Sequence, residues 1–109
     1  MFIDGAKTYA GRLADVTSFA AVARRGSRAF YDEVTTQRCV DGSVDPKSRD
    51  WRRECGKINP GYEPAVRAYA TAARAGIIKV LECDWPPGPF NGTDGTCMAR
   101  FPRVNGSVA

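Results

Sequence analysis

The sequence predicts a mainly α fold of three to four short helices, stapled by two disulfide bonds and followed by an irregular Pro/Gly-rich segment. Apolar residues recur at three- and four-residue steps, which is the helical period. Four cysteines occur in only 109 residues, and four of the seven prolines follow residue 83. We therefore expect one domain, with a helical part over residues 1–83 and an irregular, disulfide-anchored tail over residues 84–109.

The first helix is expected between an N-cap at Asp4 and a stop at Gly26. Leu13 and Val16 belong to a stripe of apolar residues that repeats every three or four positions. Arg12 falls between these positions, so we expect it on the polar face of this helix.

Two shorter helices are expected next. Ser27 can cap a helix in which Phe30 and Val34, four residues apart, share a face. Asp45 followed by Pro46 is typical of a helix start, with an N-cap and then a proline at the first helical position.

A further helix is expected to begin at Glu63 and Pro64 and to end at Gly76. Residues 77–81 then favour a short strand because they are rich in β-branched side chains, although an extended packing segment is the alternative. The prolines that follow exclude a helix in the next segment.

The four cysteines are the most informative residues, namely Cys39, Cys55, Cys83 and Cys97. An even number of cysteines in a short chain favours a disulfide framework in an oxidising compartment. The alternatives are free thiols in the core and a four-cysteine zinc module. The intervals of 15, 27 and 13 residues contain no tight pair of the kind that holds zinc. Three pairings are possible and the sequence alone does not choose between them. We favour pairing of neighbours, which would close two loops worth about 3 kcal/mol each, over the nested pairing.

The sequence indicates no catalytic centre, no cofactor site and no metal site. It contains no histidine, which removes the commonest general base and the commonest zinc ligand. Two pairs of nearby acids, Asp32 with Glu33 and Glu82 with Asp84, are expected on the surface. The prediction is therefore a protein that binds rather than one that catalyses.

The net charge of +4 is spread along the chain. Clusters at residues 24–28 and 49–53 are mixed with acids or followed by them, which is typical of a solvated helix surface, so we expect no nucleic-acid partner. No apolar run approaches the roughly 20 residues of a membrane span. The first seven residues do not resemble a signal peptide, so we expect either a cytosolic protein or a processed chain.

The tail carries the residues expected to dock on a partner, namely Trp85, Phe90 and Phe101. Aromatic side chains on a proline-stiffened backbone lose little entropy on binding. Alternatively, Trp85 and Phe90 fold back as a lid on the helices. Asn91 and Asn105 lie in N-glycosylation sequons, although Asn-Gly turns explain both segments equally well.

The order of several short segments resembles the N subunit of photosystem I. The segments are Arg12-Leu13-Ala14, Phe19-Ala20, Cys39, Leu81-Glu82-Cys83 and Cys97. The cysteine intervals are longer here than in that family, and its tryptophan-rich ending is missing. The resemblance implies an accessory subunit of the thylakoid lumen, bound peripherally to a membrane complex, with no catalytic residue.

The expected function is a non-enzymatic accessory or structural subunit that docks on a larger protein assembly in an oxidising compartment. That compartment would be an organelle lumen such as the thylakoid, the extracellular space or the periplasm. The alternatives are a secreted disulfide-rich ligand or inhibitor that acts alone, and the four-cysteine zinc module.

Overall fold

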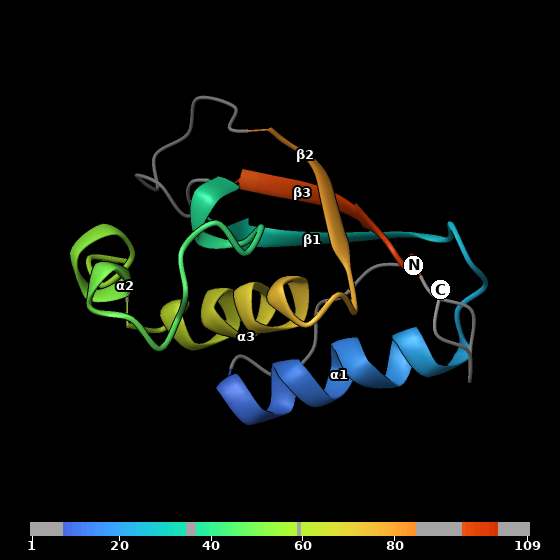
Figure 1. Cartoon of the computed structure of the whole chain (residues 1–109), viewed down its shortest axis with the longest axis horizontal. Coiled ribbons are helices and arrows are strands. Elements are labelled where there is room, and N and C mark those ends of the chain that lie inside the picture. Colours follow the sequence, from blue (N-terminus) through green and yellow to red (C-terminus); the bar gives the residue numbers. More distant parts are fainter. Residues whose placement is uncertain (1–7, 35–36, 59, 85–94, 103–109) are drawn as a thin grey trace.

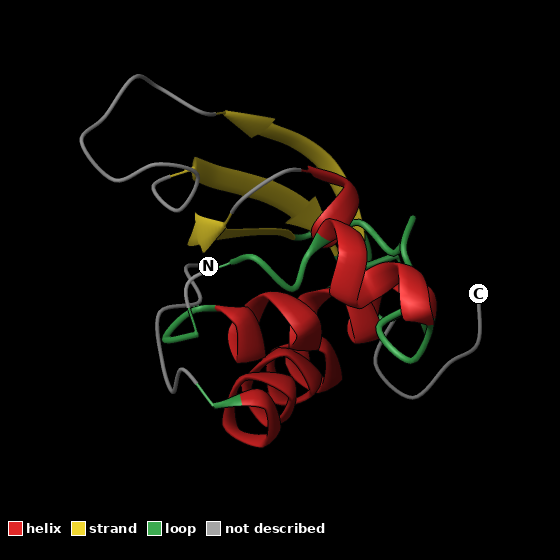
Figure 2. Cartoon of the chain, turned by 90° about the vertical axis from the view of Figure 1, so that its left-hand side faces the viewer, coloured by secondary structure: helices red, strands yellow, loops and turns green. Residues whose placement is uncertain are grey.

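The computed structural model describes residues 8–34, 37–58, 60–84 and 95–102. These residues form a mixed α/β fold in which a three-stranded sheet joins the predicted helices, so the expectation of a mainly α fold is correct only in part. Helix α3 lies between helix α1 and the sheet (Figure 1). The α-helices gather on one side of the sheet, as Figure 2 shows, and the other side carries no helix of the described segments.

The sheet has the strand order β1-β3-β2, and both pairings are antiparallel. Its strands are β1 (Arg28–Val34), β2 (Lys79–Asp84) and β3 (Gly95–Arg100). The strand that comes last in sequence is therefore the central one. An irregularity in the register between Val80 and Glu82 leaves Leu81 as an extra residue in β2, as in a β-bulge.

The segment expected to form a second helix is instead strand β1. Phe30 and Val34 do have helical spacing, but Arg28, Ala29 and Phe30 alternate between exposed and fully buried positions. Alternation with a period of two is the pattern of a strand with one buried face. Because this segment pairs with β3, it forms a strand despite the helical spacing of Phe30 and Val34.

Strand β3 also corrects the expectation of an irregular segment over residues 84–109. Cys97 and Ala99 are fully buried, while their neighbours in β3 are less buried. The ladder continues past the strand end, where the Phe101 amide donates to the Ser27 carbonyl at 3.0 Å. The end of the described chain is therefore part of the folded core.

Helix α1 (Tyr9–Val22) begins later and ends earlier than expected. Thr8 is its N-cap, because the Thr8 hydroxyl accepts a hydrogen bond from the Gly11 amide at 3.1 Å. The predicted cap at Asp4 lies outside the described residues. The helix ends before Gly26, whose φ of +85° serves the turn into β1.

Arg12 is buried, with 1% of its surface exposed, and not on a polar face as expected. Its guanidinium donates a hydrogen bond to the Tyr69 hydroxyl on α3 and lies 5.4 Å from the centre of the Tyr69 ring. A buried guanidinium requires such partners because removing it from water is unfavourable. Helices α1 and α3 are thus joined by a polar contact within an apolar interface.

Helix α3 (Glu63–Arg74) confirms the helix predicted to begin at Glu63 and Pro64. Small side chains let it sit closely between two layers, since Ala65, Ala68, Ala70 and Ala72 are all buried. The loop of residues 40–48 passes close to the C-terminal end of α3 at Gly42. A Cβ atom there would lie 3.2 Å from the backbone nitrogen of Arg74, and the φ of Gly42 is +88°.

Helix α2 (Arg49–Glu54) corresponds to the short helix predicted after Pro46, although its N-cap is Ser48. A disulfide joins Cys55, at its C-cap, to Cys39 in the 3-10 helix η1 (Gln37–Cys39). Beside the disulfide, Arg38 and Glu54 form an ion pair at 3.1 Å. The hydrogen bond and the charge of Glu54 raise the pKa of Arg38 above its usual value.

Among the helices in the described ranges, none combines the length and the apolar character that crossing a bilayer requires.

Candidate functional site

The aromatic residues predicted to dock on a partner do not form a surface together in the part of the chain that is described. Phe101 is 1% exposed and belongs to the core, so the prediction that it contacts a partner is wrong. Its backbone pairs with Ser27, and this pairing directs the side chain inward. Trp85 and Phe90 lie outside the described residues.

All four cysteines form disulfides, and the pairing is between neighbours: Cys39 with Cys55, and Cys83 with Cys97. No thiolate remains for the zinc module considered as an alternative. The described ranges contain no cluster of three or more residues of the types that hold metals. Two disulfides fit an oxidising compartment such as the extracellular space.

The face of the sheet that no described helix covers is the first candidate site, and we call it the outer face. It consists of the side chains that alternate with the buried ones, listed as Arg28, Phe30, Lys79, Glu82, Thr96, Met98 and Arg100. The side opposite to it is covered by helices (Figure 2). Phe30 is 38% exposed there and is one of two large apolar residues that the described part of the chain exposes, the other being Val22 on α1.

Three cations form a row across one end of the outer face. In the sheet register, Arg100 of the central strand lies opposite both Arg28 of β1 and Lys79 of β2. Residues directly opposite one another on antiparallel strands project to the same side, and like charges in such positions destabilise the sheet. Arg24 and Arg25 are exposed in the turn that leads into β1, which adds positive charge near this end.

The next row of the outer face is apolar at its centre. Phe30 lies opposite Met98, and Met98 lies opposite Glu82. Together with Thr96 and Cys83 these side chains line a hollow of about 540 Å³. The outer face therefore offers an apolar patch beside a row of positive charge.

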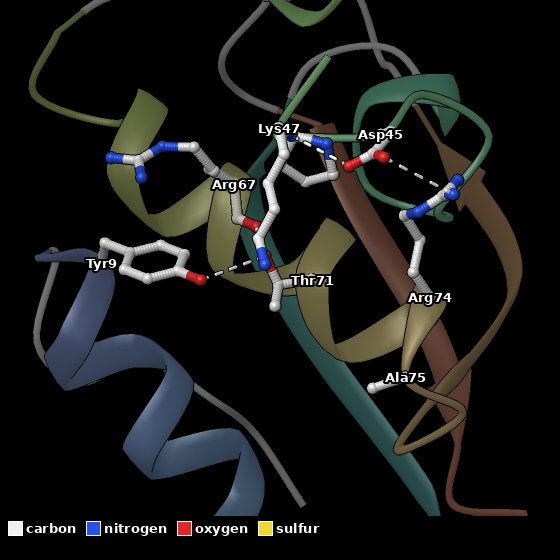
Figure 3. A pocket seen from close by; sticks show the side chains of 8 residues that line it. Tyr9, Asp45, Lys47, Arg67, Thr71, Arg74 and Ala75 are labelled. Atoms are coloured by element: carbon white, nitrogen blue, oxygen red, sulfur yellow. Dashed lines mark hydrogen bonds and ion pairs between the residues drawn. The ribbon is translucent and has the colours of Figure 1, made fainter.

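A pocket beside α3 is the second candidate site (Figure 3). It has a volume of about 420 Å³ and is lined by Tyr9 of α1, by Arg67, Thr71, Arg74 and Ala75 at α3, and by Asp45, Pro46 and Lys47. The Lys47 side chain extends over the pocket toward Thr71, while the Arg67 guanidinium lies over the Tyr9 ring (Figure 3). Three cations and one carboxylate thus line it.

The three cations of this pocket have different surroundings. Arg74 donates to the Gly42 carbonyl at 2.8 Å and lies 3.8 Å from the Asp45 carboxylate. Arg74 therefore holds the loop of residues 42–45 onto α3. Arg67 uses its Nε to bind Glu63 at 2.8 Å. Lys47 is exposed and makes no ion pair within the described ranges.

Sequence reasoning missed both candidate sites. Arg28 was noticed only as part of a charged cluster on an expected helix, and Lys47, Arg67 and Lys79 were not singled out. The residues of each site come from distant parts of the chain, so no local motif could have indicated them. The alternation at residues 96–101 was the one available signal, since it could have predicted a strand with Met98 and Arg100 on a single face.

None of the comparisons with known proteins found a relative of this chain. The chain matches no protein-family model, no curated protein and no solved structure.

Proposed function

We propose that this chain is a non-enzymatic docking module that attaches to an acidic surface of a larger protein assembly in an oxidising compartment. The row of Arg28, Arg100 and Lys79 across the outer face carries the proposal. Three like charges aligned in this way oppose folding, so their position is better explained by attraction to a partner than by stability.

The chemistry of the outer face sets the partner's chemistry. A complementary surface would place carboxylates over the cationic row and an apolar side chain in the hollow beside Phe30 and Met98. Electrostatic attraction would guide the encounter, and burial of the aromatic ring would slow dissociation. The resemblance to the photosystem I N subunit stays a prediction, and it agrees with the proposal only in the docking role.

The proposal is tested by photo-crosslinking in cells that make the chain naturally. A photoreactive phenylalanine analogue replaces Phe30 in one variant and Val22 in the control. Val22 is a matched control because it is apolar and even more exposed, at 73%, but belongs to α1 rather than to the sheet. We expect one crosslinked protein from position 30, attached through an acidic segment, and none from position 22.

Charge variants, and the size of the native particle in gel filtration, provide two further tests. Substituting Arg28→Gln together with Lys79→Gln should reduce the crosslink at position 30 at least tenfold and move the native chain from a large assembly to its monomer size in gel filtration. A native chain that already elutes as a monomer would contradict docking and favour a ligand or inhibitor that acts alone. Equal crosslinking at positions 22 and 30 would contradict the outer face as the docking site.

A further inference from the structure

The geometry points to a binding site for a small organic anion in the groove between residues 45–48 and α3. Lys47 and Arg67 would hold its charged oxygen atoms. This site lies among α1, α2 and α3 and involves no residue of the outer face, so it stands independently of the proposed function.

The groove is larger than the pocket of Figure 3 alone. A second hollow of about 520 Å³ is lined by Lys47, Trp51, Arg52, Glu63 and Arg67, among others. It shares Pro46, Lys47 and Arg67 with the first pocket of about 420 Å³. The two shared cations therefore stand where the hollows meet, and the space is that of an organic molecule rather than of a bare ion.

Arg67 is held in place before any ligand arrives. Glu63, one turn earlier on α3, binds its Nε, and the guanidinium lies 4.5 Å from the centre of the Tyr9 ring. Its two terminal nitrogens make no hydrogen bond within the described segments. They form a planar pair of donors that suits a carboxylate or a phosphate, and fixing them beforehand lowers the entropy lost on binding.

The hydroxyl groups of the pocket indicate what the rest of the ligand offers. Thr71 donates to the Arg67 carbonyl at 2.9 Å and accepts from Tyr9 at 3.2 Å. The Tyr9 oxygen has therefore used its hydrogen but keeps lone pairs that can accept one from a ligand. A hydroxylated anion, such as an acidic sugar, uses both the cations and this acceptor.

Trp51 supplies a second observation at the groove. Its side chain is 5% exposed and lines the second hollow, and its indole Nε1 has no hydrogen-bond acceptor in the described part of the chain. Buried donors are nearly always satisfied, so an unsatisfied one in a residue that lines the hollow is consistent with an acceptor supplied by a ligand.

Titration of the oxidised protein with two anions tests the site. Glucuronate and inorganic phosphate are added separately, each against sodium chloride of equal ionic strength, while the Trp51 indole N–H signal is followed by NMR. A Trp85→Phe variant identifies that signal, since the chain has only two tryptophans. We expect saturable binding, and the tighter of the two anions shows whether the oxyanion is a carboxylate or a phosphate.

Three variants locate the binding. Lys47→Gln and Arg67→Gln should each weaken binding at least tenfold, whereas Lys57→Gln should leave it unchanged, because Lys57 is exposed and lines neither hollow. Lys47 is exposed, so its variant should keep the fold even if loss of the Glu63 contact disturbs α3 in the Arg67 variant. Shifts no larger than those in chloride, or equal binding by unchanged protein and Lys47→Gln, would overturn the inference.

Discussion

Removing the charge of Arg100 should make the protein more stable, because Arg100 stands opposite two other cations in the sheet register. At a separation of about 6 Å in water, two like charges repel by about 0.7 kcal/mol before screening. Allowing for screening and side-chain motion, we take about 0.5 kcal/mol for each pair. Arg100→Met keeps an unbranched apolar side chain in place of the arginine stem and should gain about 1 kcal/mol, because it removes two repulsions.

Urea unfolding of the oxidised protein measures this gain. Lys79→Met removes only one repulsion and should gain about 0.5 kcal/mol, while the exposed residue Lys57 provides a control in which Lys57→Met changes stability by less than that. The gains should shrink when salt is raised from about 20 mM to about 500 mM, since the screening length then falls to about 4 Å. A loss of stability in Arg100→Met at low salt, or a gain that salt does not change, would refute the repulsion across the row.

Two further substitutions test how the fold is held. Replacing Cys39 and Cys55 together by alanine opens a disulfide whose ends are 16 residues apart and should lower the free energy of unfolding by about 3 kcal/mol; a loss below about 1 kcal/mol in urea unfolding would contradict this role. Gly42→Ala forces a methyl group against the Arg74 backbone at a φ of +88° and should lower stability by about 1–3 kcal/mol. A thermal melting temperature equal to that of the unchanged protein would show that the segment yields without strain.

The sequence predicted helix α3 well because its signals are local. Glu63 and Pro64 mark the start, and the apolar stripe keeps the helical period throughout. Strand β1 was missed because Phe30 and Val34 also fit a helix, and only pairing with β3 distinguishes the two. Such pairing joins residues about 70 positions apart, as with Arg28 and Arg100, which no local pattern shows.

The buried state of Arg12 was unpredictable for a related reason. Its position between apolar residues favours the polar face, and its burial depends on Tyr69, which belongs to another helix. The candidate sites are further examples. The cationic row exists only through the register of three strands. Lys47 and Arg67 line the same hollows although they are distant in sequence, and the contact between Arg74 and Gly42 helps to hold their segments together. The composition shows how many charged residues the chain has, but it does not show where they lie in the fold.

The central position of β3 has a consequence for how the protein is made. Strands β1 and β2 do not touch each other, so neither has a sheet partner until β3 has left the ribosome. Until then both expose unpaired backbone edges, which are prone to pair with other chains. Cys83 also lacks its partner Cys97 during this interval. A chain that ends before residue 95 would lack β3, and β1 and β2 could then form no sheet because each of them pairs only with β3.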